Sequence, residues 1–227
     1  MQTKVFLTKS LLAKSLLAGL AGGLMLGGTA MAQSDPSPGV GKAANTVMVR
    51  ARLLGVIPLD SNSSISGIGG TVNATNTVTP EVDISYFLTD NLALELIAAT
   101  TKHTINADGT ALGNLKVGTT WVLPPALTAQ YHFNPKGAIS PYLGLGINYT
   151  IFYATDASAP VTSLSIQNNW GFVMQAGVDW NFSGHWFANF DVKQIIVSTQ
   201  AKLNGGAIVA KTGLNPLIIG AGVGYRF

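Results

Sequence analysis

Nine charged side chains occupy alternate positions in segments whose intervening positions are mostly apolar. Arg50 and Arg52 are two residues apart, as are Glu81 and Asp83, and this spacing places side chains on one face of a strand. Such a set suits ion conduction, catalysis or a paired network that fills a narrow interior. We favour the paired network, because a small barrel leaves just enough room inside for side chains. The set is Arg50, Arg52, Glu81, Asp83, Glu95, Asp179, Asp191, Lys193 and Arg226.

The other motifs that could carry chemistry are incomplete. His103, His132 and His185 fall on a predicted strand end, a strand interior and a turn, whereas metal ligands must converge. Lys211-Thr212-Gly213 matches one fragment of the serine β-lactamase set without its partner motifs. Gly220 to Gly224 precedes no helix, so a dinucleotide site is not predicted. We therefore expect no enzyme, no cofactor and no metal site, and interpret these glycines as easing strand curvature and leaving space inside.

Composition indicates a membrane protein that crosses with strands. Charged residues make up 10% of the 227 residues, against about 25% in ordinary soluble domains. The chain has 26 glycines and no cysteine, so a disulfide framework is excluded. After the N-terminal region, no run approaches the ~20 apolar residues of a spanning helix. Together these features favour a membrane β-barrel.

The N-terminal region has the pattern of a secretory signal peptide. Lys4, Lys9 and Lys14 precede an apolar run at 15–28, and Ala30-Met31-Ala32 is a small-x-small cleavage site. We predict a signal peptide over residues 1–32.

Removal of the signal peptide makes the mature chain formally neutral. The segment holds three of the 13 Lys and Arg residues and none of the 10 Asp and Glu residues, which leaves ten of each. A nucleic-acid partner inferred from the basic balance therefore loses its support. Residues 33–44, with Asp, Ser, Gly and two prolines, are predicted to be a flexible periplasmic arm, followed by the barrel over 45–227.

The C-terminal stretch 217–227 shows the barrel pattern most clearly. Alternate residues from Leu217 to Phe227 are all apolar and end in Tyr225 and Phe227, while the other face is small apart from Ile218 and Arg226. Lipid is the cover expected for such an apolar face, with both aromatics at the membrane interface.

Seven further stretches repeat this alternation, which gives eight predicted strands of the length that a tilted strand needs to cross a bilayer. Short turns alternate with four long loops, 58–77, 104–120, 155–168 and 203–213, as in an eight-stranded antiparallel transmembrane barrel with short periplasmic turns and longer extracellular loops. An aromatic girdle is predicted from Trp170, Trp180, Trp186, Tyr225 and Phe227. The strands are predicted over about 45–57, 78–88, 92–103, a stretch that ends at 133, 140–154, 170–180, a stretch from 186, and 217–227.

The sequence also resembles the OmpW family along nearly the whole mature chain. The stretch from Leu123-Pro124-Pro125 to Tyr131-His132-Phe133 carries the resemblance best, followed by 141–150, 171–180, 191–193 and the closing Gly224-Tyr225-Arg226-Phe227. The resemblance implies a porin-like barrel in the outer membrane of a Gram-negative bacterium, with a narrow apolar lumen. It implies transport of small hydrophobic molecules with sideways release into lipid, and it implies no catalytic residues. The aromatic C-terminus resembles the assembly signal that other such barrels present to the barrel-assembly machinery.

We therefore expect passive uptake of small hydrophobic molecules, with lateral release where Pro124 and Pro125 cannot complete a ladder of hydrogen bonds. A structural, adhesive or receptor barrel without transport is the alternative, and a barrel enzyme or a soluble lipocalin-like barrel is less consistent with the pattern. The sequence leaves the natural solute and the oligomeric state open. The residues predicted to line an apolar upper lumen are Leu54, Ile97, Phe152, Val173, Ile195 and Ile218.

Overall fold

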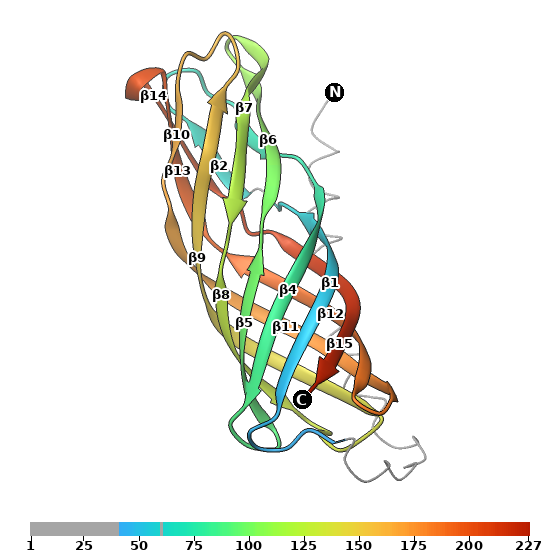
Figure 1. Cartoon of the computed structure of the whole chain (residues 1–227). Helices are drawn as coiled ribbons and strands as arrows, with labels where there is room; N and C mark the ends of the chain where they lie inside the picture. The colour runs from blue at the N-terminus through green and yellow to red at the C-terminus, as the bar shows by residue number, and fades with distance from the viewer. Residues whose placement is uncertain (1–40, 60) are drawn as a thin grey trace, which may run out of the picture. The chain divides into compact units, whose positions relative to one another are not determined.

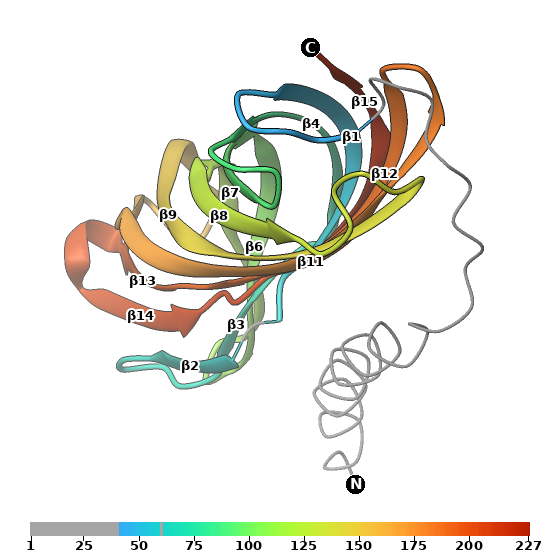
Figure 2. The same cartoon turned by 90° about the horizontal axis from the view of Figure 1, so that it is seen from below.

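The computed structural model describes residues 41–59 and 61–227. Within them, eight antiparallel strands form a closed ring, because β11 pairs with β9 at the point where the sheet would otherwise end. Figures 1 and 2 show this barrel from the side and from below. The ring strands are β1 (Val47–Ile57), β4 (Thr77–Phe87), β5 (Leu92–Ala99), β8 (Ala126–His132), β9 (Ile139–Ala157), β11 (Asn169–Ser183), β12 (Trp186–Ile196) and β15 (Leu217–Arg226).

All eight predicted strands are present, with ends that shift by a few residues. The largest difference concerns the third predicted strand, 92–103, which is interrupted at Thr100 and continues as a separate strand, β6 (Thr101–Thr110). The signal peptide predicted over residues 1–32 lies outside the described residues.

The barrel is apolar outside and polar inside over much of its length. On β4, the side chains of Val82 and Ile84 are 53% and 49% exposed. The alternate residues Glu81 and Asp83 are only 3% and 1% exposed. The period of two along a strand gives this separation, and the exposed side chains form the surface that a bilayer covers.

The C-terminal strand closes the barrel between β1 and β12, as its alternation predicted. Arg50 on β1 lies opposite Gly224 on β15. A Cβ atom added to Gly224 would lie 2.7 Å from Cγ of Arg50 and 2.3 Å from Cζ of Phe187. Gly224 therefore leaves the space that the large inward side chains occupy, as expected from the sequence.

The four stretches predicted as long loops do join barrel strands, and each contains strand residues of its own. Outward of the barrel, β7, β6 and β3 extend the sheet from β9, and β10, β13, β14 and β2 form a second sheet. We call this part the head (Figure 1, upper half). Its two sheets enclose a core that includes Val72, Ile105 and Leu203. The added elements are β2 (Ser61–Ile65), β3 (Thr71–Ala74), β7 (Gly113–Leu123), β10 (Leu164–Ile166), β13 (Ser198–Leu203), β14 (Ile208–Gly213) and the 3-10 helix η1 (Asn204–Gly206).

The opposite end of the barrel carries the three predicted short turns, at 88–91, 133–138 and 184–185. We call it the turn end, and β15 also finishes there (Figure 1). Among the described residues, no helix is long and apolar enough to cross a membrane.

Candidate functional site

The inward charges near the turn end form a network around two arginines. Arg50 Nε donates to Asp83 Oδ1 at 2.7 Å and its Nη2 donates to Glu95 Oε1 at 2.7 Å. Arg52 Nη2 lies 2.8 Å from Asp83 Oδ2 and its Nε donates to Glu81 Oε1 at 2.6 Å. The pairing of β1 with β4 sets this geometry, because it places Arg50 opposite Asp83 and Arg52 opposite Glu81.

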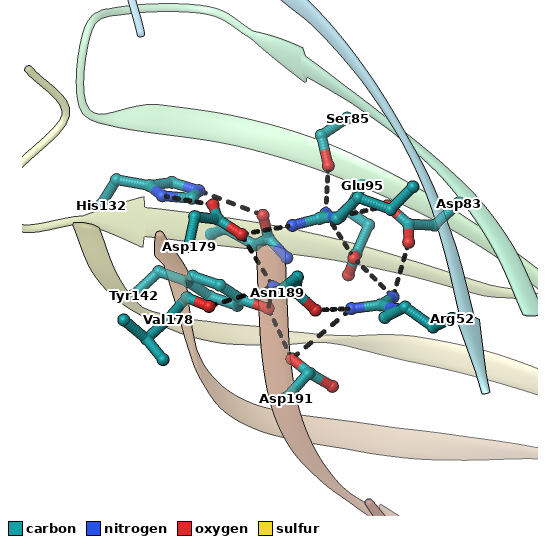
Figure 3. Close-up of polar contacts among 12 residues, drawn as sticks. Arg52, Asp83, Ser85, Glu95, His132, Tyr142, Val178, Asp179, Asn189 and Asp191 are labelled. Atoms are coloured by element: carbon teal, nitrogen blue, oxygen red, sulfur yellow. Dashed lines mark hydrogen bonds and ion pairs between the residues drawn. The ribbon is translucent and has the colours of Figure 1, made fainter. Parts of the chain in front are cut away.

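The network continues across the lumen to β9, β11 and β12 (Figure 3). Tyr142 donates its hydroxyl proton to Asp191 Oδ2 at 2.7 Å. Asn189 Nδ2 donates to Asp179 Oδ1 at 2.7 Å, and Asn189 Oδ1 accepts a bond from Arg52 Nη1 at 3.1 Å. Lys193 Nζ lies 2.5 Å from Asp191 Oδ1. The structure therefore brings these charged residues together as ion pairs inside the barrel.

Arg226 differs from the other predicted members of the network. Its side chain donates to Asn181 Oδ1 at 3.3 Å and to the carbonyl oxygen of Gly184 at 3.2 Å. Within the described residues, it therefore forms hydrogen bonds with the end of β11 and with the turn that follows it, rather than an ion pair. The sequence placed Arg226 on the correct face, but its position at the end of β15 puts it beside the turn.

Lys42 joins the network although the sequence placed it in the flexible arm. Its side chain is fully buried, with Nζ 2.8 Å from Asp179 Oδ2 and 3.1 Å from His132 Nδ1. Its backbone N–H donates to the carbonyl oxygen of Pro135 at 2.8 Å. The predicted arm therefore extends too far toward the barrel, while its residues before position 41 lie outside the described residues.

The segment that carries Lys42 is fastened to two turns. The backbone N–H of Ala44 donates to Asp90 Oδ1 at 3.2 Å, and that of Asn45 donates to the carbonyl oxygen of Phe87 at 2.8 Å. Lys136 forms an ion pair with Asp90 at 3.0 Å. Its hydrogen bond to the carboxylate, together with the bond from Ala44, lowers the pKa of Asp90. The segment thus crosses part of the turn end and brings one further cation inside.

Neutral polar side chains complete the network, and charge alone did not reveal them. Thr128 and Gln175 both donate to Glu95 Oε2, at 3.0 and 2.8 Å. Ser85 accepts a bond from Arg50 Nη2 at 2.5 Å. These three residues, like Tyr142 and Asn189, lie on the inward face that the alternation predicts, so the same period identifies them. Lys42 has no such signal, because it precedes the first strand.

The lower lumen is therefore filled by paired charges that water does not reach. Arg50, Glu95 and Asp179 are each 0% exposed. Buried ions need partners to offset the loss of hydration, and each of these three has at least two. This arrangement blocks a wide aqueous pore through the barrel.

Above this network, the lumen becomes apolar and contains a cavity. Its volume is about 110 Å³, and all six residues predicted to line an apolar upper lumen contribute to its wall. Leu54, Ile97, Val173, Ile195 and Ile218 also belong to one buried cluster, whereas Phe152 is only half-buried. Lys193 and Glu81 form part of the wall as well, so the cavity reaches down to the charged network.

The barrel wall is interrupted beside this cavity. The last pair between β5 and β8 is Ile97 with Ala126, and the next pair toward the head is Thr101 with Val122, between β6 and β7. Residues 98–100 and 123–125 between these pairs are not paired with each other, although Ala98 and Ala99 pair with β4 and Leu123 pairs with β9 on their other sides. The carbonyl oxygen of Pro125 still accepts a bond from Tyr149 on β9 at 3.1 Å, and Pro124 lines the cavity. The predicted weak point therefore coincides with a break in strand pairing.

The predicted aromatic girdle lies on the outer surface. Trp170, Trp180, Trp186 and Phe227 are 64%, 57%, 48% and 69% exposed. Tyr225 is half-buried and contacts both Trp186 and Phe227, with ring centroids 5.0 and 4.8 Å away. Trp170 and Trp180 lie near opposite ends of β11, as interfacial aromatics on the two sides of a membrane would.

The three histidines have different surroundings. His132 contacts Lys42, His103 bonds to the carbonyl oxygen of Thr75, and His185 bonds to that of Arg226. In the part of the chain that the structure describes, no group of three His, Cys, Asp or Glu side chains has the geometry to hold a metal ion.

Comparisons with known proteins agree with this architecture. The chain is 44% identical over 193 residues to an uncharacterised outer-membrane protein, y4mB, of Sinorhizobium fredii, with 83% of each chain covered. It is 31% identical over 223 residues to outer membrane protein W of Escherichia coli, which covers 94% of this chain and 99% of the relative.

A solved structure has the same fold. The crystal structure of outer membrane protein OprG from Pseudomonas aeruginosa superposes with a TM-score of 0.76 at 27% identity, over 82% of this chain and 98% of that one. The model of the OmpW family matches residues 43–227. The chain therefore belongs to the OmpW family of β-barrel proteins in the outer membrane of Gram-negative bacteria.

Proposed function

We propose that this barrel is a passive conduit for small hydrophobic molecules, which it releases sideways into the membrane. The observation that carries the proposal is the apolar cavity directly above the buried charge network. The free energy of an apolar molecule falls when it moves from water to such a wall, by roughly 25 cal/mol per Å² of buried apolar surface.

The charge network gives the conduit its direction. Downward movement would require an apolar molecule to separate paired ions such as Arg50 and Glu95, which lie 2.7 Å apart and are inaccessible to water. That separation would leave buried charges without partners, at a cost of several kcal/mol. The favourable exit from the cavity is therefore through the wall rather than along the barrel axis.

The break in pairing beside Pro124 and Pro125 supports a specific exit. Proline lacks a backbone N–H and cannot donate to a neighbouring strand, so the two prolines keep this part of the wall unpaired. Pro124 lines the cavity, and on the other side of the break so does Ala99. A molecule that leaves here reaches a lipid-facing surface that includes Leu96 and Leu127, which are 57% and 46% exposed.

The test is uptake by vesicles whose outer leaflet is lipopolysaccharide, with a hydrophobic probe and a polar probe of similar size. We expect the protein to accelerate entry of the hydrophobic probe alone. Replacement of both prolines, Pro124→Val with Pro125→Thr, should slow that entry because strand-forming residues can close the break. Pro141→Val is the matched control, since Pro141 is a proline on β9 opposite Val178, near the turn end and away from the break.

Heat-modifiable migration on gels verifies that each variant is folded. Unchanged uptake by the folded double variant would contradict release at the prolines. Equal passage of the polar probe would indicate a water-filled pore, and acceleration of neither probe would favour the structural or adhesive alternative.

A further inference from the structure

A second hollow lies on the outside of the head and is unrelated to the apolar cavity in its chemistry. It measures about 530 Å³, and its wall includes Gln167, Asn169, Ser198, Gln200 and Lys211. Four of these side chains are exposed, and Gln200 is half-buried. Pairing of β13 with β14 places Gln200 opposite Lys211 and Ser198 opposite Gly213. Because glycine has no side chain, the sheet surface is recessed at that second pair.

The hollow presents hydrogen-bond donors and one cation. Within the described residues, Lys211 has no ion-pair partner, and no carboxylate contributes to the wall. Amide side chains such as Gln167 and Gln200 donate and accept hydrogen bonds, which suits sugar hydroxyl groups. The ammonium group of Lys211 suits a phosphate. A phosphorylated sugar contains both of these groups and therefore matches the chemistry of the hollow.

The surface directly below the hollow is apolar. On β11, Trp170 and Phe172 are 64% and 68% exposed, and Phe172 lies opposite Ile196, which is 46% exposed. Ile196 is the last residue of β12, and Ser198, two residues further along the chain and also exposed, is the first residue of β13. The change from apolar to polar therefore occurs at one level, the level where an interfacial tryptophan such as Trp170 places the boundary of the membrane.

We propose that this hollow binds the phosphorylated sugar head of a glycolipid in the outer leaflet, while its acyl chains lie along Phe172 and Ile196. An amphiphile with both parts fits this surface, because the polar hollow and the apolar face are continuous. The volume of the hollow, about 530 Å³, lies in the range of sites that hold small organic molecules, roughly 300–1,000 Å³. It is larger than a phosphate group alone requires.

The experiment uses the mature protein in lipid nanodiscs and measures retained lipid by native mass spectrometry. The probes are bisphosphorylated lipid A, the same lipid without phosphates, and phosphatidylglycerol. We expect bisphosphorylated lipid A to be retained most strongly. Lys211→Glu should weaken its retention about tenfold, the scale of one charge-assisted contact, and Gln200→Ala should weaken it about twofold through loss of one neutral hydrogen bond.

Lys116→Glu is the matched control, since Lys116 is an exposed lysine on β7 in the other sheet of the head. Equal loss of lipid A with Lys116→Glu would show that overall charge attracts the lipid, and would overturn the proposal. So would undiminished binding by Lys211→Glu, or equal retention of phosphatidylglycerol. If Lys211→Glu weakened retention of the dephosphorylated lipid alone, the phosphate groups would bind elsewhere, and this result would also contradict the site.

Discussion

The two halves of the lumen are built by the same eight strands but differ in what faces inward. Near the turn end, Arg50, Glu95 and Asp179 are buried and paired. Nearer the head, Leu54, Val173 and Ile195 surround unfilled space. The strands supply an inward position at every second residue in both halves. The difference shows that residue choice, not barrel geometry, determines where this barrel is closed and where it holds a cavity.

The two halves also respond differently to the loss of a side chain. A buried ion depends on its partners, so its removal leaves other charges uncompensated. An apolar side chain at the edge of a cavity has fewer neighbours, and space beside it can accept added atoms. We therefore expect substitutions in the charged half near the turn end to affect mainly stability, and substitutions in the apolar half near the head to affect mainly transport.

The largest expected effect is that of Arg50→Met. This change removes the cation that lies 2.7 Å from both Asp83 and Glu95 and leaves Arg52 as their remaining ion-pair partner. It should lower the free energy of unfolding by about 3–5 kcal/mol. Urea unfolding from lipid vesicles measures it. Lys116→Met, on the exposed surface of the head, should change stability by less than about 0.5 kcal/mol. A loss below about 1 kcal/mol for Arg50→Met would mean that the network does not stabilise the lower half.

A smaller effect is expected for Lys42→Met. The change keeps the length and apolar part of the side chain but removes the ion pair with Asp179 at 2.8 Å. Asp179 retains Asn189 and a more distant Arg50, so we expect a loss of about 1–3 kcal/mol. The same unfolding measurement applies, with Lys136→Met as the control because Lys136 forms an exposed ion pair at the same end. Equal effects of the two changes would show that burial of Lys42 contributes nothing further.

The smallest stability effect, and the largest transport effect, is expected for Val173→Phe. Val173 is 1% exposed and lines the cavity, so the ring can enter existing space and stability should change by less than about 1 kcal/mol. Uptake of the hydrophobic probe should fall toward the rate of protein-free vesicles. Ala188→Phe on the lipid-facing side of β12 is the control for added volume. Undiminished uptake by a folded Val173→Phe variant would show that the cavity is not part of the transport route.

The sequence by itself determined the strands and the direction in which their side chains point. Alternation in β4, where Val82 and Ile84 face outward and Glu81 and Asp83 inward, is a local property that any strand must express. The same rule placed the aromatic residues outside and the apolar lining of the upper lumen inside. It also singled out Pro124 and Pro125, beside which the strand pairing is interrupted, since the missing N–H is a property of the residue itself.

Only the tertiary structure decided which residues meet. The register of β1 against β4 selects Asp83 as the partner of Arg50, and closure of β9 on β11 brings Tyr142 within reach of Asp191. The burial of Lys42 and the pairing of the predicted loops into the head likewise depend on segments far apart in the chain, such as β2 with β14. Periodicity carries no information about such distant pairings, because it reports the face of a strand and not the strand that will lie beside it.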